Sequence, residues 1–347
     1  MSSVSVVIPC YNYGHFLREA AASVLDNQPG VDVRVLIIDD ASPDGSAQVA
    51  KEIAAEDPRV ELVAHPANKG AIPSYNEGIM EWADGDYTAL VSADDQLTPG
   101  ALSRATEFLD AHPDVGFVYG HPLHFQQGQP LPVARTAVQG STVWPGQWWL
   151  RRRYHDGKSV ITCPEVVVRT SVQKQAGGWN PGLYHSADLE MWLRLAARAD
   201  VGYLRGVDQA WYRMHGKNMT TTRPHLVDLR ERKMAFDSVL ERCADQIPDR
   251  AQLAGAVNRS LCWEALWTAA RAYDRGRTEE TPVDELIAFA FECRPDAGRT
   301  SLYRALRLRQ RIGPRAMPYL QPLVLSAYVR KAQNMWWWRS WERRGIG

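Results

Sequence analysis

Two pairs of neighbouring aspartates, Asp39-Asp40 and Asp94-Asp95, each follow a short apolar run of the sequence. Carboxylates that gather in one crevice repel each other unless a cation or hydrogen-bond donors compensate their charge. Oxygen ligands of this kind suit a hard divalent ion such as Mg²⁺ or Mn²⁺. Because the chain has no G-x-x-x-x-G-K-[ST] loop, these residues favour a nucleotide diphosphate that is bridged to the protein through a metal ion.

Two further residues with chemical potential lie later in the chain. Asp188 stands in the first turn of a predicted helix, in H-S-A-D-L-E-M-W, where the helix dipole favours a negative charge. Capping of that helix is therefore an alternative to a catalytic role. His215 follows a short predicted strand near residues 209–213, and a chemical role for it depends on whether it meets the aspartates.

Aromatic and basic side chains offer possible contacts to an acceptor or a diphosphate. Trp148 and Trp149 suit stacking on a sugar ring, with simple packing as the alternative. Arg151 begins an R-R-R run that suits phosphate oxygens, although a solvated charged face is the simpler interpretation. Trp179 follows two glycines that predict a turn, and Arg213 directly precedes the Met214-His215 pair.

Alternating strands and helices should position these residues. Near-continuous apolar runs predict buried strands at residues 4–9, 33–38, 60–64, 87–91 and 115–119. Helical patterns lie between them, at residues 14–27, 44–56, 71–83 and 99–111. This alternation predicts an α/β fold with a mostly parallel sheet, in which ligands bind at the carboxyl ends of the strands. Both aspartate pairs would then face one crevice.

The remainder of the chain divides into two parts. Residues 121–158 are rich in Gly, Pro, Gln and Trp and lose periodicity, which predicts a long loop or lid, followed by a strand at 159–169 and a helix at 186–199. From about residue 222 the pattern is helical, with segments at 225–243, 252–275, 282–292, 299–311 and 321–338. The expected organisation is an α/β half at 1–120, an acceptor-side half at 121–222 and a helical region at 223–347.

Composition excludes several classes of protein. Lys plus Arg and Asp plus Glu both total 40, so the net charge of zero argues against a globally basic nucleic-acid binder. The five scattered cysteines form no C-x-x-C pair and fit a reducing compartment. The absence of G-x-G-x-x-G after the first strand and of G-x-S-x-G argues against a dinucleotide-binding enzyme and an α/β-hydrolase. No signal peptide or membrane span is seen, which predicts a cytoplasmic protein.

The C-terminal end is basic and rich in tryptophan. Residues 294–347 contain twelve basic and two acidic residues, an excess of ten positive charges, and end in W-W-W-R-S-W-E-R-R. Such a tail suits peripheral contact with an anionic membrane. An aromatic plug that packs on the protein, a lid over the acceptor and a homodimer contact are the alternatives.

The motifs, in their order, carry a resemblance. The chain reads V-S-V-V-I-P-x-Y-N, then L-I-I-D-D-A-S-x-D-G-S, N-K-G and G-D-Y-x-A-L-V-S-A-D-D, and later A-D-L-E-M-W-L-R-L-A and Y-R-M-H-G-K-N. Over roughly residues 3–220 this resembles the family-2 glycosyltransferases of GT-A fold. The resemblance implies inverting transfer of a sugar from a nucleotide diphosphate, most often UDP, with Mn²⁺ or Mg²⁺.

The resemblance also implies roles for single residues. Residues Pro9, Tyr11 and Asn12 would line the base and ribose, and Asp40 would hydrogen-bond the base. Asp94 would hold the ribose, Asp95 the metal ion, His215 the metal ion or diphosphate, and Asp188 would be the general base. The acceptor would be a cell-envelope glycan, a lipid-linked sugar, or a natural product or peptide.

Two departures leave other function classes open. Many relatives carry an acidic residue where this chain has Ser92, and another where it has Ala187. A non-catalytic binding or scaffold protein on the same fold is therefore one alternative. A nucleotidyltransferase is another, although residues 9–12 lack the Gly-rich signature with Arg and Lys that such enzymes carry there.

Overall fold

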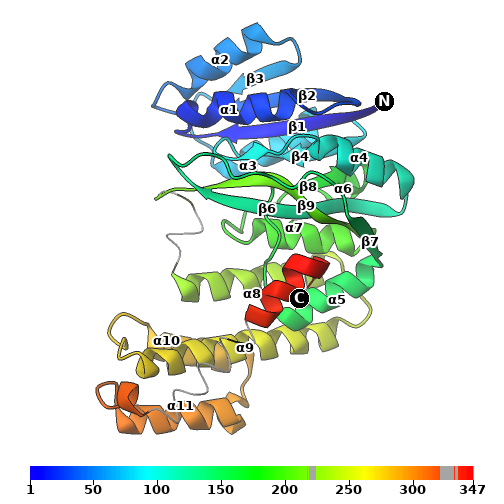
Figure 1. Ribbon diagram of the computed structural model, residues 1–347. Helices are drawn as coiled ribbons and strands as arrows, with labels where there is room; N and C mark the ends of the chain where they lie inside the picture. Colours follow the sequence, from blue (N-terminus) through cyan, green and yellow to red (C-terminus); the bar gives the residue numbers. More distant parts are fainter. Residues whose placement is uncertain (217, 219–223, 321–331, 333–334, 347) are drawn as a thin grey trace. The chain divides into compact units, whose positions relative to one another are not determined.

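The computed structural model describes residues 1–216, 218, 224–320, 332 and 335–346. The chain forms two compact units (Figure 1). The first comprises Met1–Leu150 and Val160–Thr222, and the second comprises Arg151–Ser159 and Arg223–Gly347. Each unit is described separately below.

A mixed sheet forms the centre of the first unit. Its strand order is β3-β2-β1-β4-β8-β6-β9-β5, and β7 pairs with β9. Pairs β1–β2, β1–β4, β2–β3 and β6–β9 are parallel, whereas β8 runs antiparallel to β4 and β6. The strands are β1 (Ser2–Cys10), β2 (Val31–Asp39), β3 (Val60–Ala64), β4 (Tyr87–Leu90), β5 (Gln96–Leu97), β6 (Val115–Gln126), β7 (Gly140–Trp144), β8 (Val166–Arg169) and β9 (Asp200–Met214). The predicted α/β fold with a mostly parallel sheet is thus confirmed.

Helices cover the sheet because its central strands are apolar on both faces. The consecutive residues Val7 and Ile8 of β1 point to opposite faces, as do Ile37 and Ile38 of β2, and all four side chains are fully buried. Burial on both faces explains the near-continuous apolar runs. The helices of this unit are α1 (Gly14–Leu25), α2 (Ser46–Glu56), α3 (Ala71–Asn76), α4 (Ala101–Ala111), α6 (Thr170–Ala176) and α7 (Ala187–Ala196), and α5 (Gly146–Asp156) begins in it.

A close contact at Gly78 fixes the position of α3 on the sheet. The chain continues from α3 into a π-helical turn, Glu77–Trp82. A Cβ atom at Gly78 would lie 2.5 Å from Cγ1 of Val7 in β1. Only glycine lets the backbone approach this strand so closely, and the contact sets the height at which Tyr75 and Asn76 stand over the sheet.

The expected loop over residues 121–158 is wrong for much of its length. Strand β6 continues to Gln126 because its end pairs with the long strand β9, and β7 pairs with β9 from the other side. Helix α5 then occupies Gly146–Asp156. The single-sequence pattern missed the end of β6 and β7 because cross-strand pairing with β9, and not periodicity, specifies them. The strand expected at 159–169 is also shorter, since β8 begins only at Val166.

The second unit is helical. It contains α8 (His225–Arg242), α9 (Arg250–Asp274), α10 (Val283–Cys293) and α11 (Ser301–Ile312), together with a helical stretch at 335–344. Helix α9 packs against α8, α10 and α11, and a buried ion pair of 2.8 Å joins Arg309 to Asp274. Most of the helix expected at 321–338 lies outside the described residues. Within the described part of the chain, no helix has the length and apolar character needed to span a membrane.

Candidate active site

A cavity of about 500 Å³ opens in the first unit at the carboxyl ends of β1 and β4. Many of the sequence-predicted site residues line it: Pro9, Tyr11, Asp40, Asp94, Asp95, Trp179 and Asp188. The volume lies within the ~300–1,000 Å³ range of ordinary ligand sites. Side chains from five separate segments of the sequence therefore meet at one place.

Tight turns carry the chain from β1 and β2 into this cavity. Asn12 and Ala41 both adopt left-handed backbone conformations, with φ of 62° and 59°. The backbone N–H of Asn12 donates to Oγ of Ser42 at 3.1 Å, and this bond ties the two turns together. Non-glycine residues in this region carry strain that recurs at functional sites. Asn12 itself does not appear among the described cavity-lining residues.

The two residues of the first aspartate pair have different surroundings. Asp39 is buried, and its Oδ2 accepts a hydrogen bond of 3.2 Å from the backbone N–H of Ser42. It caps the turn and is not among the described lining residues. Asp40 reaches the cavity, and its carboxylate accepts from the backbone N–H groups of Lys69 and Gly70, each at 2.8 Å. The N-K-G motif is thus a loop folded around Asp40.

The charge of Asp40 is stabilised by donors. Its Oδ1 lies 2.8 Å from Nδ1 of the buried His65. Burial opposes ionisation of Asp40, but hydrogen bonds from Lys69, His65 and Gly70 outweigh it and lower the pKa of this carboxyl. Asp40 is consequently an ionised acceptor at the cavity wall.

The second aspartate pair meets the motif that follows β9. Nε2 of His215 lies 3.0 Å from Oδ2 of Asp94. The backbone N–H of Arg213 donates to Oδ1 of Asp95 at 3.0 Å. The side-chain Nε of Arg213 donates to the backbone carbonyl of Asp94 at 2.9 Å. The guanidinium of Arg213 also pairs with Glu19 at 2.5 Å. The predicted meeting of His215 with the aspartates is therefore present, while Arg213 supports the pair from behind the cavity wall.

A negative charge on Asp95 is unfavourable unless a cation compensates it. Its side chain is almost fully buried, and burial together with the adjacent charge of Asp94 raises the pKa of Asp95 well above its usual range. Two carboxylates and an imidazole supply the oxygen and nitrogen donors that Mn²⁺ or Mg²⁺ accepts, and such ions commonly complete their shells with substrate phosphates. The donor types of Asp94, Asp95 and His215 thus suit a divalent ion, and a metal site at Asp95 stays a prediction.

Asp188 projects from the first turn of α7, and other residues of that helix are deeply buried. Glu190 and Arg194 form an ion pair of 2.8 Å with side chains that are 0% and 1% exposed. Arg194 also donates to the backbone carbonyls of Ala176 and Gly178. The helix that carries Asp188 is thereby joined to the turn that carries Trp179.

Trp179 is held from two directions. Asn76 accepts from the backbone N–H of Trp179 at 2.5 Å and donates to its carbonyl at 3.0 Å. The preceding Gly177 has φ of 85°, which the predicted turn requires. The indole packs edge-on against Tyr75, with ring centroids 5.5 Å apart, and its Nε1 is buried and has no hydrogen-bond partner among the described residues. A buried donor without a partner is uncommon in folded proteins, and this one is closed off from the cavity as well as from solvent.

Three other predicted contact residues do not line the cavity. Trp149 is 1% exposed and packs in the core against Phe117, with its Nε1 3.4 Å from the hydroxyl of Tyr119. Trp148 is 47% exposed and stacks on Trp144. Arg151 belongs to the second unit and pairs with Asp249 at 2.9 Å. Packing, the alternative given for the two tryptophans, describes Trp148 and Trp149 in this structure, and a partly exposed ion pair describes Arg151.

Sequence reasoning missed several side chains at the cavity. Tyr13 lies against His215, and burial and the charges of Asp94 and Asp95 raise the pKa of Tyr13 to about 12. Glu165 directly follows the lining residues 162–164 and is not itself among them; it is 1% exposed and accepts from the backbone N–H and hydroxyl of Thr162, and burial raises the pKa of Glu165 to about 8. The charge of Asp188 adds to this rise. The sequence signal that could have identified Glu165 was an acidic residue directly before the apolar run of residues 166–168.

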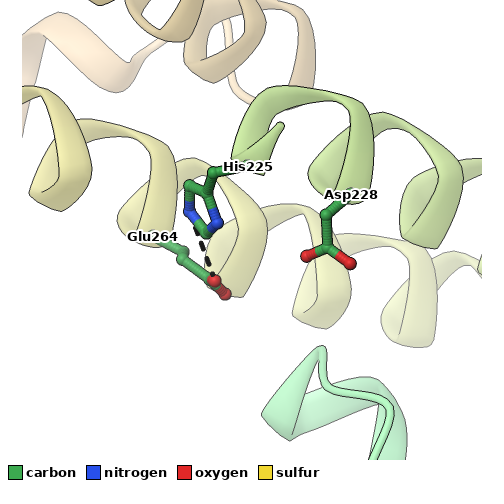
Figure 2. Close-up of side chains that lie close together, drawn as sticks. All are labelled: His225, Asp228 and Glu264. Atoms are coloured by element: carbon green, nitrogen blue, oxygen red, sulfur yellow. Dashed lines mark ion pairs between the residues drawn. The ribbon is translucent and has the colours of Figure 1, made fainter. Parts of the chain in front are cut away.

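A second group of potential metal ligands lies in the helical unit. His225 and Asp228 of α8 and Glu264 of α9 place one donor atom each within 4.8 Å of the others (Figure 2). However, Arg232 already pairs with Asp228 at 2.9 Å and with Glu264 at 2.8 Å. Burial opposes ionisation of Glu264, but the charge of Arg232 outweighs it and lowers the pKa of that carboxyl. The guanidinium supplies the cation here, so this group joins two helices.

Comparison with known proteins agrees with this geometry. A family profile described as "Glycosyl transferase family 2" matches residues 5–172. The putative teichuronic acid biosynthesis glycosyltransferase TuaG of Bacillus subtilis is 26% identical over 63% of this chain and 82% of its own length. The uncharacterized glycosyltransferase YibD of Escherichia coli is 27% identical over 76% of this chain and 78% of its own length.

Solved structures show the same fold at lower identity. Staphylococcus aureus TarS 1-349, in complex with UDP-GlcNAc, has a TM-score of 0.60 and 15% identity, covering 91% of this chain and 89% of the other. The mannosyltransferase PcManGT of Pyrobaculum calidifontis, in complex with GDP-Man and Mn²⁺, has a TM-score of 0.53 and 16% identity, covering 95% of this chain and 87% of the other. The sequence motifs, the sheet and these relatives agree: residues 5–172 of the chain form a domain that matches glycosyltransferase family 2, and the chain is a transferase.

Proposed function

We propose that the protein is an inverting, metal-dependent glycosyltransferase that uses a nucleotide-diphosphate sugar, with UDP as the expected nucleotide. The observation that carries the proposal is the convergence of Asp40, Asp94, Asp95 and Asp188 on one cavity of about 500 Å³. Structural neighbours bound to UDP-GlcNAc and to GDP-Man support a nucleotide-sugar donor.

In the proposed reaction Asp188 is the general base. Its carboxylate takes the proton of an acceptor hydroxyl while that oxygen attacks the anomeric carbon of the donor sugar. The new glycosidic bond forms as the bond to the diphosphate oxygen breaks, and the electron pair leaves with the nucleoside diphosphate. A single displacement of this kind inverts the anomeric carbon and needs no covalent nucleophile.

The remaining residues bind and orient the donor. Asp40 accepts a hydrogen bond from the nucleotide base, and Asp94 from a ribose hydroxyl. Asp95 and His215 would hold Mn²⁺ or Mg²⁺, which when bound neutralises negative charge on the diphosphate. The Mn²⁺ bound by the neighbour PcManGT supports this assignment. Trp179, which lines the cavity, would contact the acceptor.

The acceptor in this proposal is a hydroxyl of a cell-envelope glycan. The relative TuaG, named for teichuronic acid biosynthesis, supports it. A soluble natural product or peptide is the alternative acceptor. Because all five cysteines are free, the protein fits a reducing compartment such as the cytoplasm.

Peripheral membrane contact through the C-terminal tail is part of the same proposal. In the helical stretch 335–344, Met335, Trp336 and Trp338 are exposed to 47%, 65% and 49%. Arg339 and Arg343 are exposed on the same stretch. Exposed tryptophans between arginines suit the headgroup layer of an anionic bilayer, where apolar rings and positive charges both find partners.

A thermal-shift titration tests the donor site. The melting temperature is measured with UDP, GDP, dTDP or CDP, each with and without Mn²⁺. A ligand at 100 times its Kd stabilises the native state by about 2.7 kcal/mol. We expect one nucleotide to raise the melting temperature, and the rise to depend on Mn²⁺ and to disappear in Asp95→Asn. Equal responses to metal in both proteins would contradict the assignment of Asp95.

Product analysis separates the function classes. With a nucleotide-sugar donor, release of nucleoside diphosphate supports glycosyl transfer, whereas release of pyrophosphate would identify a nucleotidyltransferase. Asp188→Asn should lower the rate of transfer by about 10²–10⁴ while donor binding persists. Undiminished transfer by this variant would remove Asp188 from the role of base. If the original protein binds a donor but shows no turnover, the scaffold alternative is favoured.

A further inference from the structure

A second cavity lies entirely within the helical unit. Its volume is about 510 Å³, again in the range of ligand sites. One face of α9 forms its wall, and residues from the end of α5, the segment after α10 and the start of α11 complete it. The lining residues are His155, Ala256, Arg259, Ser260, Cys262, Trp263, Leu266, Arg294, Thr300 and Leu302.

A pair of stacked indoles lies on α9 beside this cavity. Trp263 and Trp267, one helical turn apart, stack with ring centroids 5.5 Å apart and an angle of 15° between their planes. Both side chains are partly exposed. Arg259 lies one turn before Trp263 on the same face, because residues four apart are neighbours on a helix. An arginine and two parallel indoles therefore form a continuous stripe.

The charge at this cavity is positive. Arg259 is exposed, and no hydrogen bond or ion pair involves its guanidinium among residues 1–216, 218, 224–320, 332 and 335–346. Arg294 pairs with Asp296 at 2.7 Å, but the Asp296 side chain is 53% exposed. His155 contributes a third basic group, and the described lining contains no Asp or Glu. An unpartnered guanidinium beside an aromatic face is suited to a planar anionic group.

We propose that this cavity and the Trp263–Trp267 stripe bind an anionic glycan, one whose sugar rings carry carboxylate or phosphate groups. The apolar faces of sugar rings stack on the indoles, and the anionic groups pair with Arg259 and Arg294. The residues that would bind the glycan all belong to the helical unit. Its further role, holding an acceptor chain at the enzyme and raising its effective concentration, rests on the proposed function.

Other occupants fit less well. Single-stranded nucleic acid also stacks on aromatic rings beside arginines, but the chain as a whole has no net positive charge and is a glycosyltransferase. A second copy of this chain would fit only if the surface that it brings against Arg259 supplied a carboxylate to pair with the guanidinium. An anionic glycan satisfies the indoles and the guanidinium together, so it is the ligand that the residues favour.

Binding to full-length protein tests the proposal. Tryptophan fluorescence and calorimetry are recorded with a hexamer of galacturonic acid, a phosphorylated mannose oligosaccharide, neutral maltohexaose and single-stranded dT12. The variants are Trp263→Ala, Trp263→Phe and Arg259→Gln. Trp336→Ala and Arg250→Gln, an exposed tryptophan and an exposed arginine away from this cavity, are the matched controls. Melting curves confirm that each variant is folded.

We expect one or both anionic oligosaccharides to bind, and the stronger one identifies the anionic group. Trp263→Ala should weaken binding about tenfold or more, Trp263→Phe less, and Arg259→Gln about three- to tenfold with a shallower dependence on salt. The controls should bind as the original protein does. UDP binding in the first unit should be unchanged in every variant, so loss of glycan binding is distinguishable from failure of the donor site.

Four results would overturn the proposal. These are equal binding of maltohexaose, tighter binding of dT12, no binding of any oligosaccharide, and binding that Trp263→Ala and Arg259→Gln leave unaltered. A dimer whose dissociation is promoted by Trp263→Ala, measured by sedimentation without glycan, would instead assign the stripe to self-association.

Discussion

The ion pair between Glu190 and Arg194 holds the acceptor side of the cavity, and breaking it should have a large effect. Arg194 is 1% exposed and donates to Glu190 and to the carbonyls of Ala176 and Gly178. Arg194→Met leaves the carboxylate of Glu190 buried without its cation. Removal of one partner of a buried pair costs about 3–5 kcal/mol of unfolding free energy.

That free energy translates into a measurable shift. For a unit of roughly 210 residues, 1 kcal/mol shifts the melting temperature by about 2–4 °C, so Arg194→Met should lower it by about 6–20 °C. The double variant Glu190→Gln/Arg194→Met loses the same hydrogen bonds to the carbonyls of Ala176 and Gly178 but leaves no uncompensated charge buried. The single variant should consequently melt below the double variant.

Calorimetry of the original protein, the single variant, the double variant and a control measures this order of melting temperatures. The control is Arg18→Met, which breaks an exposed pair with Glu52 and should have little effect. Because Arg194 joins α7 to the turn before Trp179, the folded fraction of the double variant should also show weaker acceptor binding and unchanged donor binding. A double variant that melts at or below the single variant would refute the argument from uncompensated charge.

Three further predictions concern other parts of the chain. Burial raises the pKa of Glu165 to about 8, so the folded state binds the proton more tightly than the unfolded state does. The free energy of unfolding should therefore fall as pH rises from about 4.5 to about 8, by up to about 1.4 kcal/mol per pH unit. Glu165→Gln should flatten this pH dependence in thermal melts. Asn76→Ala should raise the KM for acceptor more than it lowers kcat, because it frees the backbone of Trp179, and an unchanged KM in steady-state assays would contradict this. Trp336→Ala with Trp338→Ala should reduce co-sedimentation with anionic vesicles, with neutral vesicles as the control; retention equal to that of the original protein would exclude these side chains from membrane contact.

The fold and the acidic residues of the cavity are predictable from the sequence for one physical reason. Strands β1, β2 and β4 are buried on both faces, so their apolar runs are nearly continuous and stand out, and the polar residues that end them are easily seen. Parallel strands bring their carboxyl ends to one edge, which is why Asp40 and Asp94 could be placed in one crevice. His215 could be linked to them only through the resemblance.

Residues that act through packing were predicted less well. Trp148 and Trp149 are adjacent and chemically identical, yet one is 47% exposed and the other 1%, because they occupy different faces of α5. The sequence pattern treated their segment as a loop and had no helix on which to separate the two faces. Arg151 was likewise assigned by charge alone, whereas its partner Asp249 lies 98 residues away.

Long-range contacts are what turn the predicted acidic residues into a site. Asp95 is held by the backbone N–H of Arg213, 118 residues away, and Trp179 by Asn76, 103 residues away. These contacts cost chain entropy to form and leave no local pattern, so no window of sequence reveals them. They also fix the orientation of the groups that would meet donor and acceptor. Substitutions at Asn76 and Arg194 should therefore impair transfer although neither side chain is assigned a chemical step.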